Sequence, residues 1–220
     1  MPNSLSHNQN YGEELYLLVR QILGKPNGNS CLVYVTERIG ATLAGAKPAE
    51  ILTFPLNKGQ IRSADWERSR ASFLAQRLLG LREIRKANGT EQVFFYHGDA
   101  LDEALTHQPH LNFLQDQGYP LHYKREDYLD LLMAKLQGEN FPHEIGLFLG
   151  YPLKDVLGFM GHPALKLVKT RGWKVYGSER LSDLRYESFQ DARNMVLTIM
   201  SDILSVRLKR ENVSGPNYMF

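Results

Sequence analysis

Apolar residues recur at every third or fourth position in several stretches of the chain, and this spacing predicts amphipathic helices. The clearest case is 125–136, where Tyr128, Leu132 and Leu136 fall on one side and Gly138 ends the pattern. The longest helix is predicted over 188–208. Further helices are predicted over 13–23, from Ser30 to the Lys47-Pro48 pair, over 63–80, from Asp99, and over 110–117.

Shorter apolar runs predict strands. The predicted strands are 50–54, 81–86, 92–97, 164–169 and 173–176. Asn88-Gly89 lies between the second and third of these and is a strong hairpin signal. The run QVFFYH (92–97) is apolar almost throughout, so we expect it to be a central strand covered on both faces. Thr170-Arg171-Gly172 predicts a second hairpin near the C-terminus.

These elements predict the fold class. About five short strands joined by hairpins, with seven or eight helices, are typical of an α+β (mixed α/β) fold rather than of repeated βαβ units. We expect the helices to pack on one small, mostly antiparallel sheet. The expected organisation is a flexible tail over 1–10, a single domain over 11–210 and a C-terminal tail over 211–220.

Composition excludes several classes of protein. The 220 residues suit one domain with a sizeable core, and 26 basic against 24 acidic side chains leave a net charge of +2, too little to recruit nucleic acid or acidic lipid. The single cysteine, Cys31, excludes an intrachain disulfide and a cysteine-based zinc site. No signal peptide is evident, and no apolar run approaches the ~20 residues of a membrane-spanning helix. The expected location is the cytoplasm.

The segment from Phe141 to Pro163, FPHEIGLFLGYPLKDVLGFMGHP, has an unusual amount of glycine and proline for an apolar stretch. Pro142 suits the first turn of a helix, which places His143 and Glu144 in that turn too. The helix dipole favours a charged Glu144 and a neutral His143, and a neutral imidazole can ligate a metal or act as a base. The ordinary interpretation is that Glu144 caps the helix and His143 hydrogen-bonds locally.

Two arguments limit the catalytic interpretation of this His–Glu pair. Adjacent side chains on a helix point about 100° apart, so His143 and Glu144 should not converge on one atom. The pair is also not a metalloprotease motif, because Leu147 stands where the second histidine is required. His143 remains a candidate base or metal ligand, beside a candidate carboxylate at Glu144.

The same segment contains a helix break. Gly146 and Gly150 share one helix face, which permits close approach of another backbone or of a flat ligand. Gly150-Tyr151-Pro152 then ends the helix, and a second short helix begins at Leu153. A broken helix can hold an anion at its exposed amides, whereas the ordinary alternative is a tight helix–turn–helix in the core. Tyr151 and Asp155 are candidate ligand-binding residues here.

Other candidate residues lie elsewhere in the chain. Lys47 could contact a phosphate or carboxylate, or could complement the C-terminus of the preceding helix. Trp173 and Lys174 belong to a stretch of interleaved basic and aromatic residues that could bind RNA or a nucleotide, although a small patch on a nearly neutral chain is more typical of a solvated strand face.

A further constellation is centred on the end of the apolar strand 92–97. His97 closes this strand and Asp99 follows it, at a place where functional groups often gather in folds that contain both helices and strands. These two side chains could meet His143 in one pocket. The histidines are otherwise scattered along the chain.

Four motifs resemble the signature of an uncharacterised bacterial family, domain-of-unknown-function family 3793. They are FPHEIGLFLGYPLKDVLGF (141–159), TLAGAKPAEIL (42–52), GYP (118–120) and GWKVYG (172–177). The resemblance covers the chain from about residue 30 to residue 195 and brings no established activity, cofactor or catalytic residue. Members of that family are found mostly in anaerobes, often near genes for ferrous-iron transport and flavodoxin-like proteins. The resemblance therefore implies a link to iron, haem or redox metabolism.

The sequence leaves three functional hypotheses. The first is a small-molecule or cofactor-binding protein, and potentially an enzyme, whose pocket forms around 141–155 with His143 as ligand or base and Lys47, Tyr151 and Lys174 as polar contacts. The second is a non-enzymatic interaction or regulatory module, which predicts an exposed apolar patch. The third and weakest is RNA binding through 171–180. We expect no membrane partner, and the sequence assigns neither a cofactor nor an oligomeric state.

Overall fold

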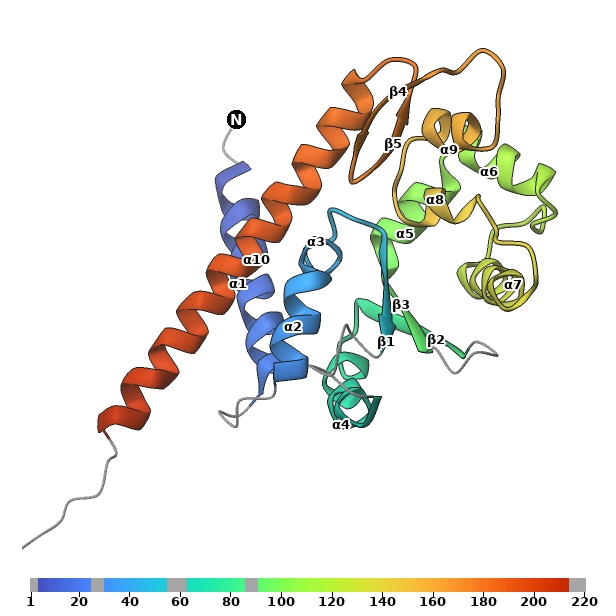
Figure 1. The fold of residues 1–220 in the computed structure, drawn as a ribbon. Coiled ribbons are helices and arrows are strands. Elements are labelled where there is room, and N and C mark those ends of the chain that lie inside the picture. The colour runs from blue at the N-terminus through green and yellow to red at the C-terminus, as the bar shows by residue number, and fades with distance from the viewer. Residues whose placement is uncertain (1–3, 25–29, 55–62, 86–90, 214–220) are drawn as a thin grey trace, which may run out of the picture.

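The computed structural model describes residues 4–24, 30–54, 63–85 and 91–213 (Figure 1). In chain order the helices are α1 (Ser4–Leu23), α2 (Ser30–Arg38), α3 (Gly40–Leu43), α4 (Ser63–Leu74), α5 (Gly98–Thr106), α6 (Gln108–Asp116), α7 (Arg125–Gln137), α8 (Ile145–Phe148), α9 (Leu153–Phe159) and α10 (Arg180–Val213). The strands are β1 (Ala49–Phe54), β2 (Leu79–Arg85), β3 (Glu91–His97), β4 (Leu167–Arg171) and β5 (Trp173–Tyr176).

The α+β class is confirmed, but the strands form two sheets instead of one. Strands β1, β3 and β2 form an antiparallel sheet in that order, which confirms the hairpin and the central position of β3. Strands β4 and β5 form a separate hairpin. Most side chains of β4 are exposed, so this strand has no buried face with which to join the larger sheet. The predicted turn at Asn88-Gly89 lies outside the described residues.

Strand β3 divides the apolar interior into two cores. Val93 and Phe95 belong to a core with residues of α1, α2, α4 and α10, whereas Phe94 and Tyr96 belong to a core with residues of α5, α7 and α8. This division follows from the alternation of side chains along a strand. Figure 1 shows the sheet between these two groups of helices, with α10 running along α1. Every candidate site residue except Lys47 lies in or after β3 in the sequence.

Several element boundaries differ from the sequence predictions. Helix α1 begins at Ser4, within the predicted tail 1–10. Helix α10 begins at Arg180, eight residues before the predicted start at 188, and its first turns contain Ser182 and Asp183, which bond to Asp155 and Lys169. Helix α4 ends at Leu74, so Gly80 does not close it. Gly80 instead lies in β2, where an added Cβ would approach the ring of its cross-strand partner Tyr96 to 2.0 Å.

The break in the 141–160 segment has the shape of a tight helix–turn–helix. Gly150 adopts φ of +81°, and a Cβ there would lie 2.6 Å from Pro48 Cδ. A Cβ on Gly146 would lie 2.7 Å from Val156 Cγ2. Pro48 and α9 of the same chain therefore occupy the space beside these two glycines. This agrees with the ordinary interpretation of the break, a tight helix–turn–helix in the core.

Candidate functional site

Glu144 is a buried structural carboxylate and does not cap a helix. It stands at the N-cap of α8, which is a single turn, but its side chain makes no capping hydrogen bond. It is 4% exposed, and its Oε1 accepts hydrogen bonds from Lys135 Nζ at 2.6 Å and from the Tyr119 hydroxyl at 3.4 Å. The capping interpretation is wrong because the Lys135 ammonium group is a stronger partner for a buried carboxylate than a backbone amide. Burial, together with Glu144, raises the pKa of Tyr119.

His143, next to Glu144, is exposed and lines a cavity. Its ring meets that of Phe159 edge-on with 5.0 Å between centroids, and the centroid of Phe141 lies 6.0 Å away. Lys174 Nζ lies 5.3 Å from the centroid of the same Phe159 ring. With Trp173, these side chains line a cavity of about 280 Å³, which we call the aromatic pocket. Its remaining walls include the buried apolar side chains of Ile145, Leu149 and Val156.

Tyr151 and Trp173 form a shared wall of this pocket. Their rings are stacked with 4.6 Å between centroids and 18° between planes. Both residues line the aromatic pocket and also a second cavity of about 340 Å³. Burial, with a smaller contribution from Glu50, raises the pKa of Tyr151 to about 12, so its hydroxyl is protonated at neutral pH.

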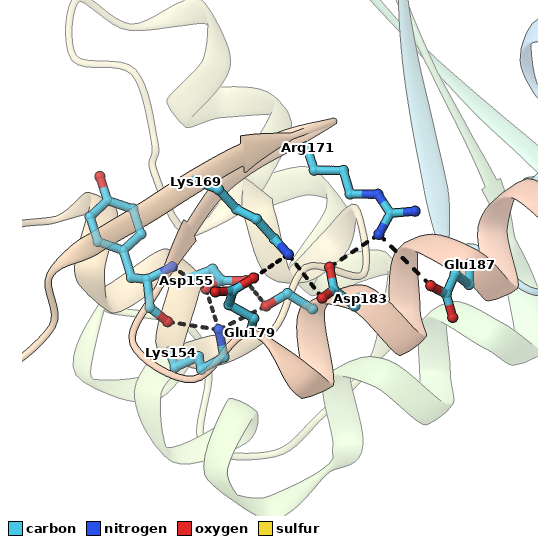
Figure 2. Close-up of polar contacts among 9 residues, drawn as sticks. Lys154, Asp155, Lys169, Arg171, Glu179, Asp183 and Glu187 are labelled. Atoms are coloured by element: carbon cyan, nitrogen blue, oxygen red, sulfur yellow. Dashed lines mark hydrogen bonds and ion pairs between the residues drawn. The ribbon is translucent and has the colours of Figure 1, made fainter.

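Asp155 fixes the position of Trp173. The carboxylate is 2% exposed, and its Oδ2 accepts hydrogen bonds from Trp173 Nε1 at 2.8 Å and from Ser182 Oγ at 2.6 Å. Its Oδ1 accepts from the Tyr176 amide at 2.8 Å and from Lys154 Nζ at 2.6 Å. Figure 2 shows Asp155 with Lys154 between α9, the hairpin and α10. Because each carboxylate oxygen already accepts two hydrogen bonds, Asp155 acts as a positioning residue and not as a free ligand-binding group.

Ion pairs hold the β4–β5 hairpin against α10. Lys169 Nζ binds Glu179 and lies 2.9 Å from Asp183 Oδ2, while Arg171 Nη1 lies 3.3 Å from Asp183 Oδ1 and 3.8 Å from Glu187 Oε1 (Figure 2). Arg171, a basic residue of the stretch 171–180 considered for RNA binding, is thus paired with carboxylates, as is Lys169 just before that stretch. Lys174 is exposed and points to the ring of Phe159.

Lys47 lies in the second cavity, not in the aromatic pocket. It is 8% exposed, it pairs with Glu50 at 2.6 Å, and its Nζ lies 5.7 Å from the ring centroids of both Tyr151 and Phe189. The sequence places Lys47 and His143 in one pocket. The structure separates them because the stacked Tyr151 and Trp173 rings stand in the wall that the two cavities share.

His97 and Asp99 lie in a third cavity, of about 640 Å³, which has no lining residue in common with the aromatic pocket. These two side chains therefore do not meet His143. The reason is that His97 caps α5: its Nδ1 accepts a hydrogen bond from the Ala100 amide at 3.3 Å. Burial lowers the pKa of His97, so the imidazole is neutral near pH 7 and carries its proton on Nε2.

The described part of the chain contains no group of three His, Cys, Asp or Glu side chains that could hold a metal ion. His107 and His110 lie in that part with 4.8 Å between their ring centroids, but no third ligand of these types joins them. The described residues thus offer no full ligand set for an iron ion. Within the same described ranges, no helix is long and apolar enough to cross a membrane.

Sequence reasoning missed several residues of these cavities. Phe159 borders both His143 and Lys174, and Arg38 and Arg193 line the cavity that contains Lys47. Arg38 and Arg193 lie on α2 and α10, far apart in the chain, so no local motif links them to Lys47. The exposure of Phe159, at the end of α9, marks it as a site residue, but exposure is known only from the fold.

Comparison with known proteins gives one match. A model of a family described as "Protein of unknown function (DUF3793)" matches residues 35–208. This range contains every residue that lines the aromatic pocket and the cavity of Lys47. No curated protein and no solved structure matches the chain.

Proposed function

The chain belongs to the DUF3793 family, and we propose that it is a small-molecule or cofactor-binding protein whose ligand occupies the aromatic pocket. The ligand that suits this pocket is flat and largely apolar, with one acidic group. The observation that carries the proposal is the arrangement of His143 and Lys174 around the exposed ring of Phe159, at one cavity.

The chemistry of the lining supports this ligand class. Ligand pockets are mostly apolar, with a few polar groups that fix orientation. The buried side chains of Ile145 and Val156 offer an apolar floor, while Trp173 offers a ring held rigidly by Asp155. Lys174 supplies a positive charge for an acidic group, and His143 supplies a hydrogen bond or, if a reaction occurs, a base.

The volume of about 280 Å³ limits the size of this ligand. It suits a molecule of one or two rings, because ligand pockets of roughly 300 Å³ stand at the lower end of the usual range. A porphyrin would extend beyond this cavity. Within the proposed link to iron, haem or redox metabolism, we therefore propose a small redox-active molecule as the ligand.

The test is to identify what the protein carries. We would purify it anaerobically from its own host and examine it by native mass spectrometry with metal analysis. A retained small molecule supports the proposal, and its identity decides whether the redox link holds. If the purified protein carries no small molecule, it is then titrated with 1-naphthoate and with 1-naphthylmethanol, which differ in the acidic group, by isothermal titration calorimetry.

Variants show whether binding occurs at the aromatic pocket. His143→Ala and Phe159→Ala are expected to weaken naphthoate binding by about tenfold or more, since each removes a lining group. His122→Ala is the matched control, because His122 is also exposed but does not line this pocket. The proposal fails if no small molecule is retained and naphthoate binds no tighter than about 1 mM, or if all three variants bind alike.

The interaction-module hypothesis is favoured by a different observation. Phe159, Met160, Leu167 and Val168 are exposed at the end of α9 and on β4. Native mass spectrometry of the host-purified sample would favour this alternative if it detected a bound partner protein and no small molecule. Co-purified RNA would favour the third hypothesis, which the pairing of Arg171 with Asp183 and Glu187 weakens.

A further inference from the structure

The cavity that contains Lys47, which we call the lysine cavity, is a second candidate site with its own chemistry. We propose that it binds the phosphate group of a small phosphorylated metabolite, independently of the aromatic pocket. The proposal rests on a buried lysine with spare hydrogen-bonding capacity, on two arginines from distant elements, and on the charge and size of the cavity.

Lys47 is the first of these observations. Lysine is rarely buried unless it is paired, and here Glu50 is its partner at 2.6 Å. An ammonium group has three N–H donors, of which Glu50 accepts one. The remaining donors face a cavity between the rings of Tyr151 and Phe189, each 5.7 Å from Nζ. Surroundings with little water strengthen the attraction between such a group and an anion.

Arg38 and Arg193 add two further positive charges. Arg38 is exposed, lies 5.1 Å from the ring centroid of Tyr34, and forms no ion pair with any residue in the described part of the chain. Arg193 donates from Nε to the Glu37 carbonyl and from Nη2 to the Glu37 carboxylate, both at 3.2 Å. This pair orients the guanidinium group of Arg193 and leaves its Nη1 without a hydrogen bond to a described residue.

The charge around the cavity favours an anion. Three of its side chains are cationic, but Glu50 pairs with Lys47 and Glu37 pairs with Arg193, so the surplus is the one positive charge of Arg38. A phosphate monoester carries about −1.5 to −2 at pH 7, whereas a single carboxylate carries about −1. Arginine and lysine together are also the residues that proteins commonly use to hold phosphate. A phosphate ester also offers three acceptor oxygens where a monocarboxylate offers two, so three cationic donors suit the phosphate better.

The size of the cavity selects a small ester. Its volume of about 340 Å³ exceeds what a phosphate ion needs, and its remaining walls include Trp173 and Tyr186. Aromatic walls of this kind suit a sugar or a flat base next to the phosphate. A mononucleotide is therefore a suitable probe, although any phosphorylated metabolite of similar size has the required chemistry.

Isothermal titration calorimetry on the full chain tests this proposal with matched probes. AMP and inorganic phosphate are expected to bind, while adenosine, which lacks the phosphate, is expected to bind at least about tenfold more weakly than AMP. AMP affinity should fall as salt concentration rises. Citrate tests whether the cavity prefers carboxylates to phosphate. If citrate binds while AMP and phosphate do not, the phosphate assignment is overturned.

Variants locate the site. Lys47→Met and Arg38→Gln should each weaken AMP binding by about tenfold, and Glu50→Gln should strengthen it because the competing carboxylate is gone. Lys174→Met, which removes the lysine of the aromatic pocket, is the control and should leave AMP affinity unchanged. Arg38 is exposed, so its variant is expected to fold even if Lys47→Met does not. Equal AMP affinity in the wild type and in Arg38→Gln, or no binding of AMP below about 1 mM, overturns the proposal.

Discussion

The indole N–H of Trp173 donates a hydrogen bond of 2.8 Å to the carboxylate of Asp155, and this contact joins the hairpin to α9. The same carboxylate binds Ser182 in the first turns of α10 and the Tyr176 amide in β5. One buried side chain thus connects α9, the β4–β5 hairpin and α10, and the first two of these line the aromatic pocket. The position of the Trp173 ring, which both cavities use as a wall, depends on this connection.

Asp155→Ala is expected to lower the free energy of unfolding by about 3 kcal/mol, because it removes the acceptor of Trp173 and of the Tyr176 amide and leaves Lys154 without its charged partner. Urea denaturation followed by Trp fluorescence measures this loss. Asp202→Ala, at an exposed aspartate on α10, is the control and should change stability by less than about 0.5 kcal/mol. Equal stability of the two variants would contradict the anchoring role.

The buried pair of Lys135 and Glu144 gives a second prediction. Lys135→Met should destabilise the protein by about 2 kcal/mol, since it leaves a carboxylate that is 4% exposed without its charged partner. The double variant Lys135→Met/Glu144→Gln should recover part of that loss because no buried charge remains. Thermal or chemical denaturation checks both values, with Lys124→Met as the exposed control. A double variant that is less stable than the single one would argue against the charge explanation.

Alanine substitutions at two glycines with positive φ distinguish the cost of backbone strain from the cost of steric contact. Gly118→Ala, at φ of +89° with no atom within 4 Å of the added Cβ, should cost about 1 kcal/mol from backbone strain alone. Gly150→Ala, at φ of +81°, should cost about 3 kcal/mol because the Cβ also meets Pro48 at 2.6 Å. The difference in unfolding free energy is the readout. Similar losses for both variants would mean that Pro48 moves away freely.

The histidine that caps α5 predicts a pH dependence. Burial lowers the pKa of His97 in the folded protein, so the unfolded chain binds the proton more readily. Stability is therefore retained above the unfolded value of about 6.5 and is lost as the pH falls below it, toward the lower folded pKa. His97→Asn preserves a side-chain acceptor for the Ala100 amide but does not titrate. It should lose less stability than the wild type between about pH 7 and 5, and parallel curves would contradict the assignment.

The sequence predicted best the features that depend on neighbouring residues. The apolar run of β3 identified the central strand, since a strand with both faces covered must be apolar at successive positions. Gly150-Tyr151-Pro152 identified the helix break, because a positive φ and a proline cannot continue a helix. The motif spanning 141–159 identified the family, as the match over 35–208 confirms.

The residues of the candidate site were predicted from the sequence only in part. His143 was identified from its place beside Pro142, and it does line a cavity. Its expected companions differ: Glu144 turns toward Lys135, and Lys47 lies in another cavity. The partner of a buried side chain depends on which groups the fold places near it. For Glu144 that group is the charged side chain of Lys135, nine positions earlier in the chain.

The sequence by itself therefore determined the α+β class, the antiparallel pairing of β2 with β3, the break after α8 and the family. Each of these follows from local backbone preference or from apolar periodicity. Only the tertiary structure decided that β4 and β5 form their own sheet, that the stacked Tyr151 and Trp173 rings separate two cavities, and that Arg38, Lys47 and Arg193 share one of them. These are contacts between distant segments, and their energies depend on burial and charge pairing that exist only once the chain has folded.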